Sequence, residues 1–183
     1  MAEKKRLFFA VVPDNTTRLL LAAHLNQYLP EGLPGKTIPA GNWHVTLRFL
    51  GSVASIDSDR VIYEASRRLG GDSFPVKLGG LGAFPHSSRA VVLWVGFAVG
   101  KEKMEILASQ CEDAATAIGL AAEERPFHPH LTLARIRPPR DVRRIIEVVP
   151  SVALPFKVAE ARLYESYLGC DGTRYTVIER FPL

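Results

Sequence analysis

The stretch His44-Val45-Thr46-Leu47 recurs in the second half of the chain as His130-Leu131-Thr132-Leu133. Each copy lies in a run typical of a strand, 42–50 for the first and 125–137 for the second. Side chains on a strand alternate between its two faces, so each copy presents a histidine and a threonine on one face. The copies lie almost half of the 183 residues apart. We therefore expect two lobes of similar size that face a shared groove, each contributing one copy.

The rest of the chain predicts further short strands with helices between them. Strands are expected over 6–13, 74–84, 89–99, 156–168 and 174–181, and helices over 14–28, 55–69, 100–120 and 141–149. Turn residues at 85–88 and 169–172 separate neighbouring strands, and Pro138-Pro139 is expected to end the strand of the second copy. Hairpins with interspersed helices predict an α+β fold with antiparallel or mixed sheets and helices on the outside.

The composition predicts one globular domain spanning 1–183, which we expect to be a monomer. The chain is 47% apolar, and its formal net charge of +4 permits a polyanionic partner without proving one. We find neither an apolar run of the roughly 20 residues needed to span a bilayer nor a signal peptide, so we expect a cytoplasmic protein without a membrane partner. Cys111 and Cys170 form no CxxC pair and are expected to be reduced thiols without an assigned role.

The chemistry predicted from the two copies is acid–base catalysis on a phosphodiester. A neutral histidine can take a proton from an attacking water, and a protonated one can give a proton to the leaving oxygen. The hydroxyls of Thr46 and Thr132 can donate to non-bridging phosphate oxygens. We expect no metal and no other cofactor, because a zinc site on His44 and His130 would need a third ligand from another histidine or a cysteine.

Several residues near the copies have competing interpretations. Arg135 could bind a phosphate, but its odd offset from His130 turns it to the opposite face of a regular strand unless a bulge intervenes. Arg48 has the correct offset from His44, although a solvated strand residue is the better interpretation. Trp43 and Phe127 could stack bases but are better explained as core residues. The remaining histidines are expected on the surface, His128 at the rim of the site and His24 and His86 in solvent.

These residues resemble the two-histidine (2H) phosphoesterase superfamily. More narrowly, the chain resembles the bacterial and archaeal RNA 2′,3′-cyclic phosphodiesterases, also called 2′-5′ RNA ligases. The resemblance begins at Arg6-Leu7-Phe8-Phe9-Ala10 and includes both copies, with the fullest match at Phe127-His128-Pro129-His130-Leu131-Thr132-Leu133-Ala134-Arg135. It also includes Phe84-Pro85, Val92-Leu93-Trp94-Val95-Gly96, Leu163-Tyr164-Glu165-Ser166, Gly172 and Tyr175.

The resemblance implies a bilobal fold with pseudo-two-fold symmetry and a specific reaction. His44 would act as proton donor, His130 as proton acceptor and Arg135 as a phosphate ligand. A 2′,3′-cyclic phosphate at an RNA end would open to a 2′-phosphate, and the reverse reaction would join ends through a 2′-5′ bond. Neither direction would use ATP or metal.

Two alternatives remain open from the sequence. The substrate could be a small cyclic phosphate, such as a cyclic nucleotide or an ADP-ribose product. The chain could instead be a noncatalytic RNA-binding module, although binding alone would tolerate lysine or arginine in place of the two histidines.

Overall fold

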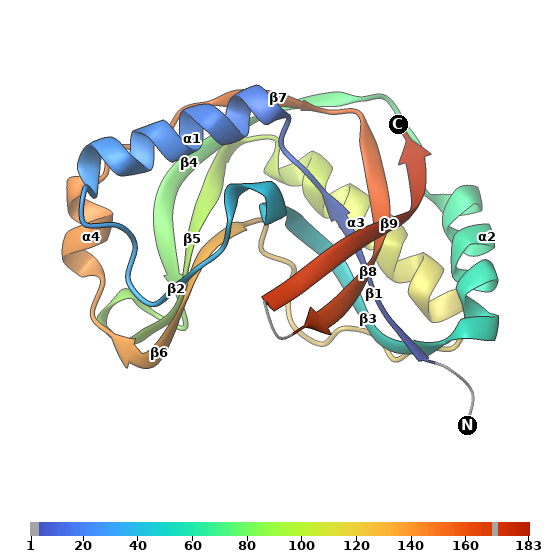
Figure 1. Ribbon diagram of the computed structural model, residues 1–183. Coiled ribbons are helices and arrows are strands. Elements are labelled where there is room, and N and C mark those ends of the chain that lie inside the picture. The colour runs from blue at the N-terminus through green and yellow to red at the C-terminus, as the bar shows by residue number, and fades with distance from the viewer. Residues whose placement is uncertain (1–3, 170–171) are drawn as a thin grey trace.

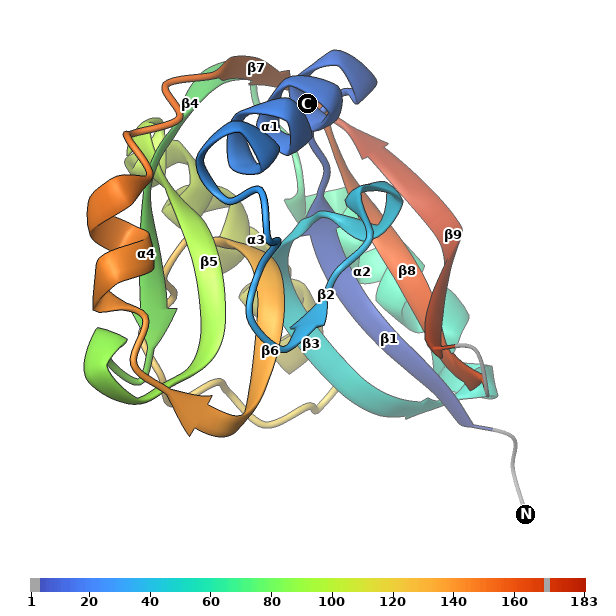
Figure 2. The same ribbon diagram turned by 60° about the vertical axis from the view of Figure 1, so that its left-hand side comes forward.

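The protein forms two antiparallel sheets that stand side by side with helices on their outer faces (Figures 1 and 2). The computed structural model describes residues 4–169 and 172–183. The first sheet has the strand order β3-β1-β8-β9, and the second has the order β2-β6-β5-β4-β7. The strands are β1 (Lys4–Val11), β2 (Lys36–Thr37), β3 (Val45–Ala54), β4 (Phe74–Phe84), β5 (Ala90–Val99), β6 (Leu131–Arg140), β7 (Pro155–Val158), β8 (Glu160–Gly169) and β9 (Gly172–Pro182). The α+β fold with two lobes is confirmed.

Two of the helices, α1 (Asn15–Tyr28) and α3 (Lys101–Ala117), each follow a strand of one sheet but cover the other sheet. Helix α1 follows β1, but the Thr17 hydroxyl donates to the carbonyl of Pro155 beside the second sheet at 3.4 Å. Helix α3 follows β5 and packs against β3 and helix α2 (Ser58–Arg68) on the first sheet. The short helix α4 (Arg143–Val148) lies against the second sheet. Each lobe is therefore assembled from segments far apart in the chain.

The structure corrects three strand predictions. The single strand expected over 156–168 is two strands, because β7 pairs with β4 in the second sheet and β8 pairs with β1 and β9 in the first. Strand β6 begins at Leu131 rather than near 125 and continues through Pro138-Pro139 to Arg140. Among the described residues, β2 pairs only with Arg135 and Ala134, and the pairing of β6 with β5 skips from Arg135 to Arg140. Pro138 and Pro139 therefore have no ladder partner on either side, and their missing N–H groups interrupt no ladder. The edge strand β2 was not expected.

One face of each motif strand packs in the larger hydrophobic core. Val45 and Leu47 on β3 and Leu131 and Leu133 on β6 are at most 5% exposed. Cys111 on α3 is fully buried, and burial raises the pKa of its thiol. It is therefore a packing residue, whereas Cys170 lies outside the described residues. No helix in the described part of the chain is long and apolar enough to cross a membrane.

Candidate active site

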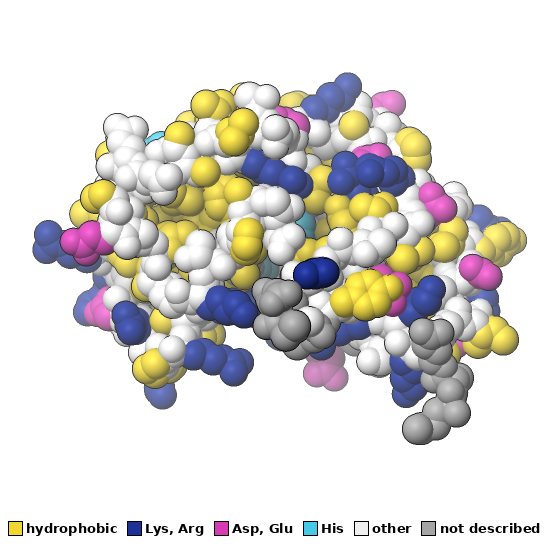
Figure 3. All heavy atoms as spheres, in the orientation of Figure 1, with side chains coloured by type: hydrophobic (Ala, Val, Ile, Leu, Met, Phe, Trp, Pro, Cys, Tyr) yellow, Lys and Arg dark blue, Asp and Glu magenta, His cyan; other side chains and the backbone are white. Residues whose placement is uncertain are grey.

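The two histidines lie immediately before the strands that carry the rest of each motif. His44 precedes β3 at the edge of the first sheet, and His130 precedes β6 in the second sheet. The two strands contact each other, which brings the motifs to the junction of the lobes. Figure 3 shows histidine side chains at the base of a hollow near the centre of the molecule, with Lys and Arg side chains around it.

A β-bulge interrupts both motif strands at the same motif position. On β3, Ala10 pairs with Thr46 while Phe9 pairs with Arg48, so Leu47 is the extra residue. On β6, Trp94 pairs with Thr132 while Leu93 pairs with Ala134, so Leu133 is the extra residue. A bulge shifts the alternation of side chains by one residue. The bulge at Leu133 therefore returns Arg135 to the face of Thr132, as the phosphate-binding role required.

Both imidazoles are oriented by the same backbone contact. His44 Nδ1 lies 2.7 Å from the carbonyl oxygen of Asn42, and His130 Nδ1 lies 2.7 Å from the carbonyl oxygen of His128. A carbonyl only accepts, so Nδ1 must carry the proton in each ring. Nε2 of each histidine is then the nitrogen available for proton transfer.

Aromatic rings pack against the imidazole of each motif histidine. The ring of His44 lies 5.0 Å from Phe8 and 5.1 Å from Tyr175, measured between centroids. The ring of His130 lies 5.0 Å from Phe84 and in edge contact with it. Rings at these separations pack favourably and restrict rotation of the imidazoles.

The surroundings of both histidines favour the neutral imidazole. Burial lowers the pKa of His44 and of His130 below the usual 6.5, and the positive charge of Arg135 lowers each pKa further. The carbonyl contacts of Asn42 and His128 act in the opposite direction, since they stabilise the protonated rings. Arg135 thus lies close enough to both rings to affect both titrations.

A pocket of about 690 Å³ opens at this junction. Thr46 and Thr132, the motif threonines, line it together with His130 and Arg135. His44 is not itself among the lining residues, but it lies two residues before Thr46, and it is close enough to His130 for the charge of that histidine to lower the pKa of His44. The structure therefore brings together all five residues predicted for the site: His44, Thr46, His130, Thr132 and Arg135.

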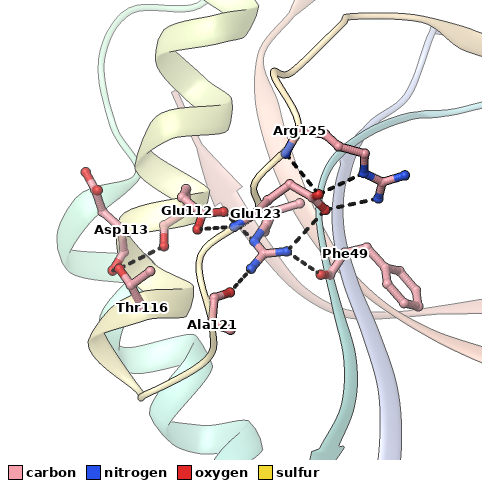
Figure 4. A network of polar contacts seen from close by, with 8 residues as sticks. Phe49, Glu112, Asp113, Thr116, Ala121, Glu123 and Arg125 are labelled. Atoms are coloured by element: carbon pink, nitrogen blue, oxygen red, sulfur yellow. Dashed lines mark hydrogen bonds and ion pairs between the residues drawn. The ribbon is translucent and has the colours of Figure 1, made fainter.

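Arg48 differs from its prediction as a solvated strand residue. Its side chain is only 10% exposed, and its guanidinium forms an ion pair with Glu112 on α3 and lies 3.8 Å from a carboxylate oxygen of Glu123 (Figure 4). It also donates to the carbonyls of Phe49 and Ala121. These contacts bind the beginning of the segment between α3 and β6 to β3. Pro126, Phe127 and His128 of that segment line the pocket, so Arg48 supports one of its walls.

The flanking aromatic and histidine residues mostly match their predictions. Trp43 is 3% exposed and donates from its indole nitrogen to the carbonyl of Ile38 at 3.0 Å, as expected for a core residue. Phe127 packs against the core and also lines the pocket. His128 and His86 are exposed, whereas His24 is half-buried with a ring nitrogen 3.0 Å from the carbonyl of Pro150.

Periodicity did not identify Glu112 and Glu123 as partners of Arg48, because a salt bridge between distant segments leaves no local signal. The aromatic residues around the histidines were present in the resemblance without a role. Among the described residues, His, Cys, Asp and Glu side chains form no group of three or more suited to a metal ion.

Comparisons with known proteins agree with this geometry. The family model described as the 2′-5′ RNA ligase superfamily matches residues 21–169. Two curated proteins named RNA 2′,3′-cyclic phosphodiesterase are similar to the chain. The one from Aeropyrum pernix is 34% identical over 80% of this chain and 85% of its own, and the one from Escherichia coli is 30% identical over 100% and 99%.

Solved structures are similar over the whole chain. A crystal structure of a phosphoesterase has a TM-score of 0.81 at 29% identity, with 99% of each chain covered. E. coli LigT complexed with 3′-AMP has a TM-score of 0.78 at 28% identity, again with 99% of each chain covered. The predicted family and fold are thus confirmed, and the chain belongs to the 2′-5′ RNA ligase superfamily.

Proposed function

We propose that this protein hydrolyses 2′,3′-cyclic phosphates at RNA ends to 2′-phosphates, with His130 as general base and His44 as general acid. The observation that carries this proposal is the matched pair of Nδ1 contacts to the carbonyls of Asn42 and His128. One imidazole of fixed orientation from each lobe suits a displacement in which one oxygen loses a proton while another gains one. The names of the relatives support the same reaction.

In the forward reaction, Nε2 of His130 takes a proton from water as the water oxygen attacks phosphorus. The bond from phosphorus to the 3′ oxygen breaks, and Nε2–H of His44 donates its proton to that oxygen. The product carries a 2′-phosphate and a free 3′-hydroxyl. His130 is then protonated and His44 neutral, and exchange with solvent restores both.

The other site residues stabilise charge on the phosphorane-like transition state. Thr46 and Thr132 donate to non-bridging oxygens, and Arg135 pairs with the same oxygens. If an RNA 5′-hydroxyl took the place of water, His130 would remove its proton, the 5′ oxygen would attack phosphorus and His44 would protonate the departing 3′ oxygen, which forms a 2′-5′ bond. The proposal includes no metal and no other cofactor. The proposed partner is RNA, and the proposed enzyme is a cytoplasmic monomer that consists of one two-lobed domain, 1–183.

Product analysis on an oligonucleotide ending in a 2′,3′-cyclic phosphate tests the function. We expect release of the 2′-phosphate at an undiminished rate in EDTA. Formation of the 3′-phosphate alone, or loss of activity in EDTA that zinc restores, would contradict the mechanism. Tight RNA binding without turnover, unchanged in a His44→Ala/His130→Ala variant, would instead favour a noncatalytic module.

A further inference from the structure

A row of side chains crosses the second sheet from the pocket to its edge. Phe84 on β4 pairs with Val92 on β5, Val92 pairs with Arg135 on β6, and Arg135 pairs with Lys36 on β2. Directly opposite residues in antiparallel strands project from the same face. The first three residues of the row line the pocket, so Lys36 continues the same face outward to the sheet edge.

Arg137 adds a third cation to this face. It lies two residues beyond Arg135 on β6 and is exposed, whereas Ala134 and Ile136 are fully buried on the opposite face. Val142 packs with these two buried residues, which identifies their face as the one covered by the segment around α4. We call Lys36, Arg135 and Arg137 the cationic strip.

The charges of the cationic strip have no carboxylate partner in the part of the chain that the structure describes. Lys36 and Arg135 stand directly opposite each other, and like charges in this position destabilise a strand pair. Within 4–169 and 172–183, no carboxylate forms an ion pair with any of the three side chains. Other arginines of the chain are paired, for example Arg143 with Asp141 and Arg180 with Glu160. A fold that keeps an unfavourable pair of this kind beside its pocket suits an anionic ligand.

We propose that Lys36 and Arg137 bind phosphodiester groups of the RNA chain on the 5′ side of the cyclic end. This rests on the proposed function, because Arg135 then binds the reacting phosphate and the strip leads away from it. An RNA strand carries further phosphates in that direction, whereas a cyclic mononucleotide has none. The strip therefore selects an RNA end over a small cyclic phosphate.

The test compares two substrates and two charge-reversed variants. The substrates are a 2′,3′-cyclic mononucleotide and a single-stranded oligonucleotide with the same terminal nucleotide. The test variant is Lys36→Glu/Arg137→Glu. The control is Lys77→Glu/Lys157→Glu, which makes a comparable charge reversal at exposed positions on β4 and β7, toward the other edge of the same sheet.

We expect the test variant to lose about tenfold or more in kcat/KM on the oligonucleotide and less than twofold on the mononucleotide. We also expect its plot of log kcat/KM against log salt concentration to be shallower by about 1.4, since each phosphate contact on a single strand contributes about 0.7. The control should match wild type in both. Equal losses on the two substrates, or the same loss in the control, would overturn the proposal.

Binding of a 2′-phosphate-ended oligonucleotide, followed by fluorescence anisotropy, separates this proposal from the reaction itself. The product cannot turn over, so the test variant should bind it about tenfold more weakly than wild type even if neither cyclic substrate is opened. Absence of hydrolysis by wild type would refute the proposed function. Equal product affinity in wild type and the test variant would refute the role of the cationic strip.

Discussion

Leu47 and Leu133 occupy the same position in two different sheets, each as the extra residue of a β-bulge at the end of its motif. Both leucines are buried, so the bulges are fixed by the core as well as by the strand pairing. The residue two places beyond each bulge differs between the lobes: it is Phe49 in the first and Arg135 in the second. The two halves of the site thus share their backbone geometry, but only the second supplies a cation at this position.

Replacement of either motif histidine should abolish most of the activity. His44→Ala and His130→Ala each remove a proton-transfer group, for which losses of about 100- to 10,000-fold are usual. His128→Ala is the matched control, because it keeps the backbone carbonyl that orients His130. It should cost less than about tenfold in kcat. Single-turnover kinetics on a cyclic-ended oligonucleotide measures all three variants, and full activity of His130→Ala would exclude its role as base.

The pH optimum of kcat/KM should lie below 6.5. The base must be neutral and the acid protonated, so the optimum falls midway between the two pKa values whichever residue has which role. Burial lowers the pKa of both His44 and His130 below 6.5 in the free enzyme. The optimum of kcat should be higher, because the bound phosphodiester anion stabilises both imidazolium forms.

Arg135→Met offers a check on this pH dependence. The charge of Arg135 lowers both histidine pKa values, so its removal should raise them and move the kcat/KM optimum to higher pH while reducing the rate. Full pH profiles of wild type and variant provide the measurement. An unchanged optimum in the variant would show that the arginine acts on neither titration.

Arg48→Met should destabilise the fold more than removal of an exposed arginine that contacts the same carboxylate. The variant leaves Glu112 and Glu123 without their shared partner. We expect a loss of about 2 kcal/mol in the free energy of unfolding, below the roughly 3–5 of a fully buried pair, because both carboxylates keep some contact with water.

Arg125→Met is the matched control for Arg48. Its side chain is 86% exposed and also pairs with Glu123, so its removal should cost at most about 1 kcal/mol. Urea unfolding compares the two variants. Similar losses of unfolding free energy in both variants would mean that the ion pairs of Arg48 contribute no more than an ordinary surface ion pair.

Gly35→Ala should displace β2 and with it Lys36. Gly35 has a φ of +78°, and a Cβ there would lie 2.5 Å from the carbonyl oxygen of Arg135. Gly32→Ala is the control that carries the backbone strain without the steric clash, since Gly32 has a φ of +85° but open space around a Cβ. Left-handed backbone costs roughly 1–2 kcal/mol in a residue other than glycine.

The larger loss in the free energy of unfolding should therefore occur in Gly35→Ala. Thermal or urea unfolding measures this difference between the glycine variants. Gly35→Ala should also reduce kcat/KM more on the oligonucleotide than on the cyclic mononucleotide, whereas Gly32→Ala should leave the ratio of the two unchanged. Identical behaviour of the two glycine variants on both substrates would mean that the position of β2 does not matter.

The sequence was most informative where the signal was local. A repeated word with an alternating pattern predicted which side chains share a face, and the turn signals at 85–88 gave the β4–β5 hairpin. The face on which Arg135 lies depends on a bulge in the pairing of β6 with β5. The sequence alone could therefore not decide whether Arg135 shares a face with Thr132. The division of 156–168 between two sheets and the partners of Arg48 are set by tertiary contacts, for which neither periodicity nor composition carries information.

The division of the chain at Ala159 has a consequence for synthesis on the ribosome. Strand β1 is made long before one of its two neighbours, β8, and before the outermost strand β9, which come from residues 160–169 and 172–182. Until they emerge, β1 keeps one unpaired edge, and Tyr175, which packs against His44, is missing. The surroundings of the first histidine therefore stay incomplete until residues well beyond the second motif have been synthesised.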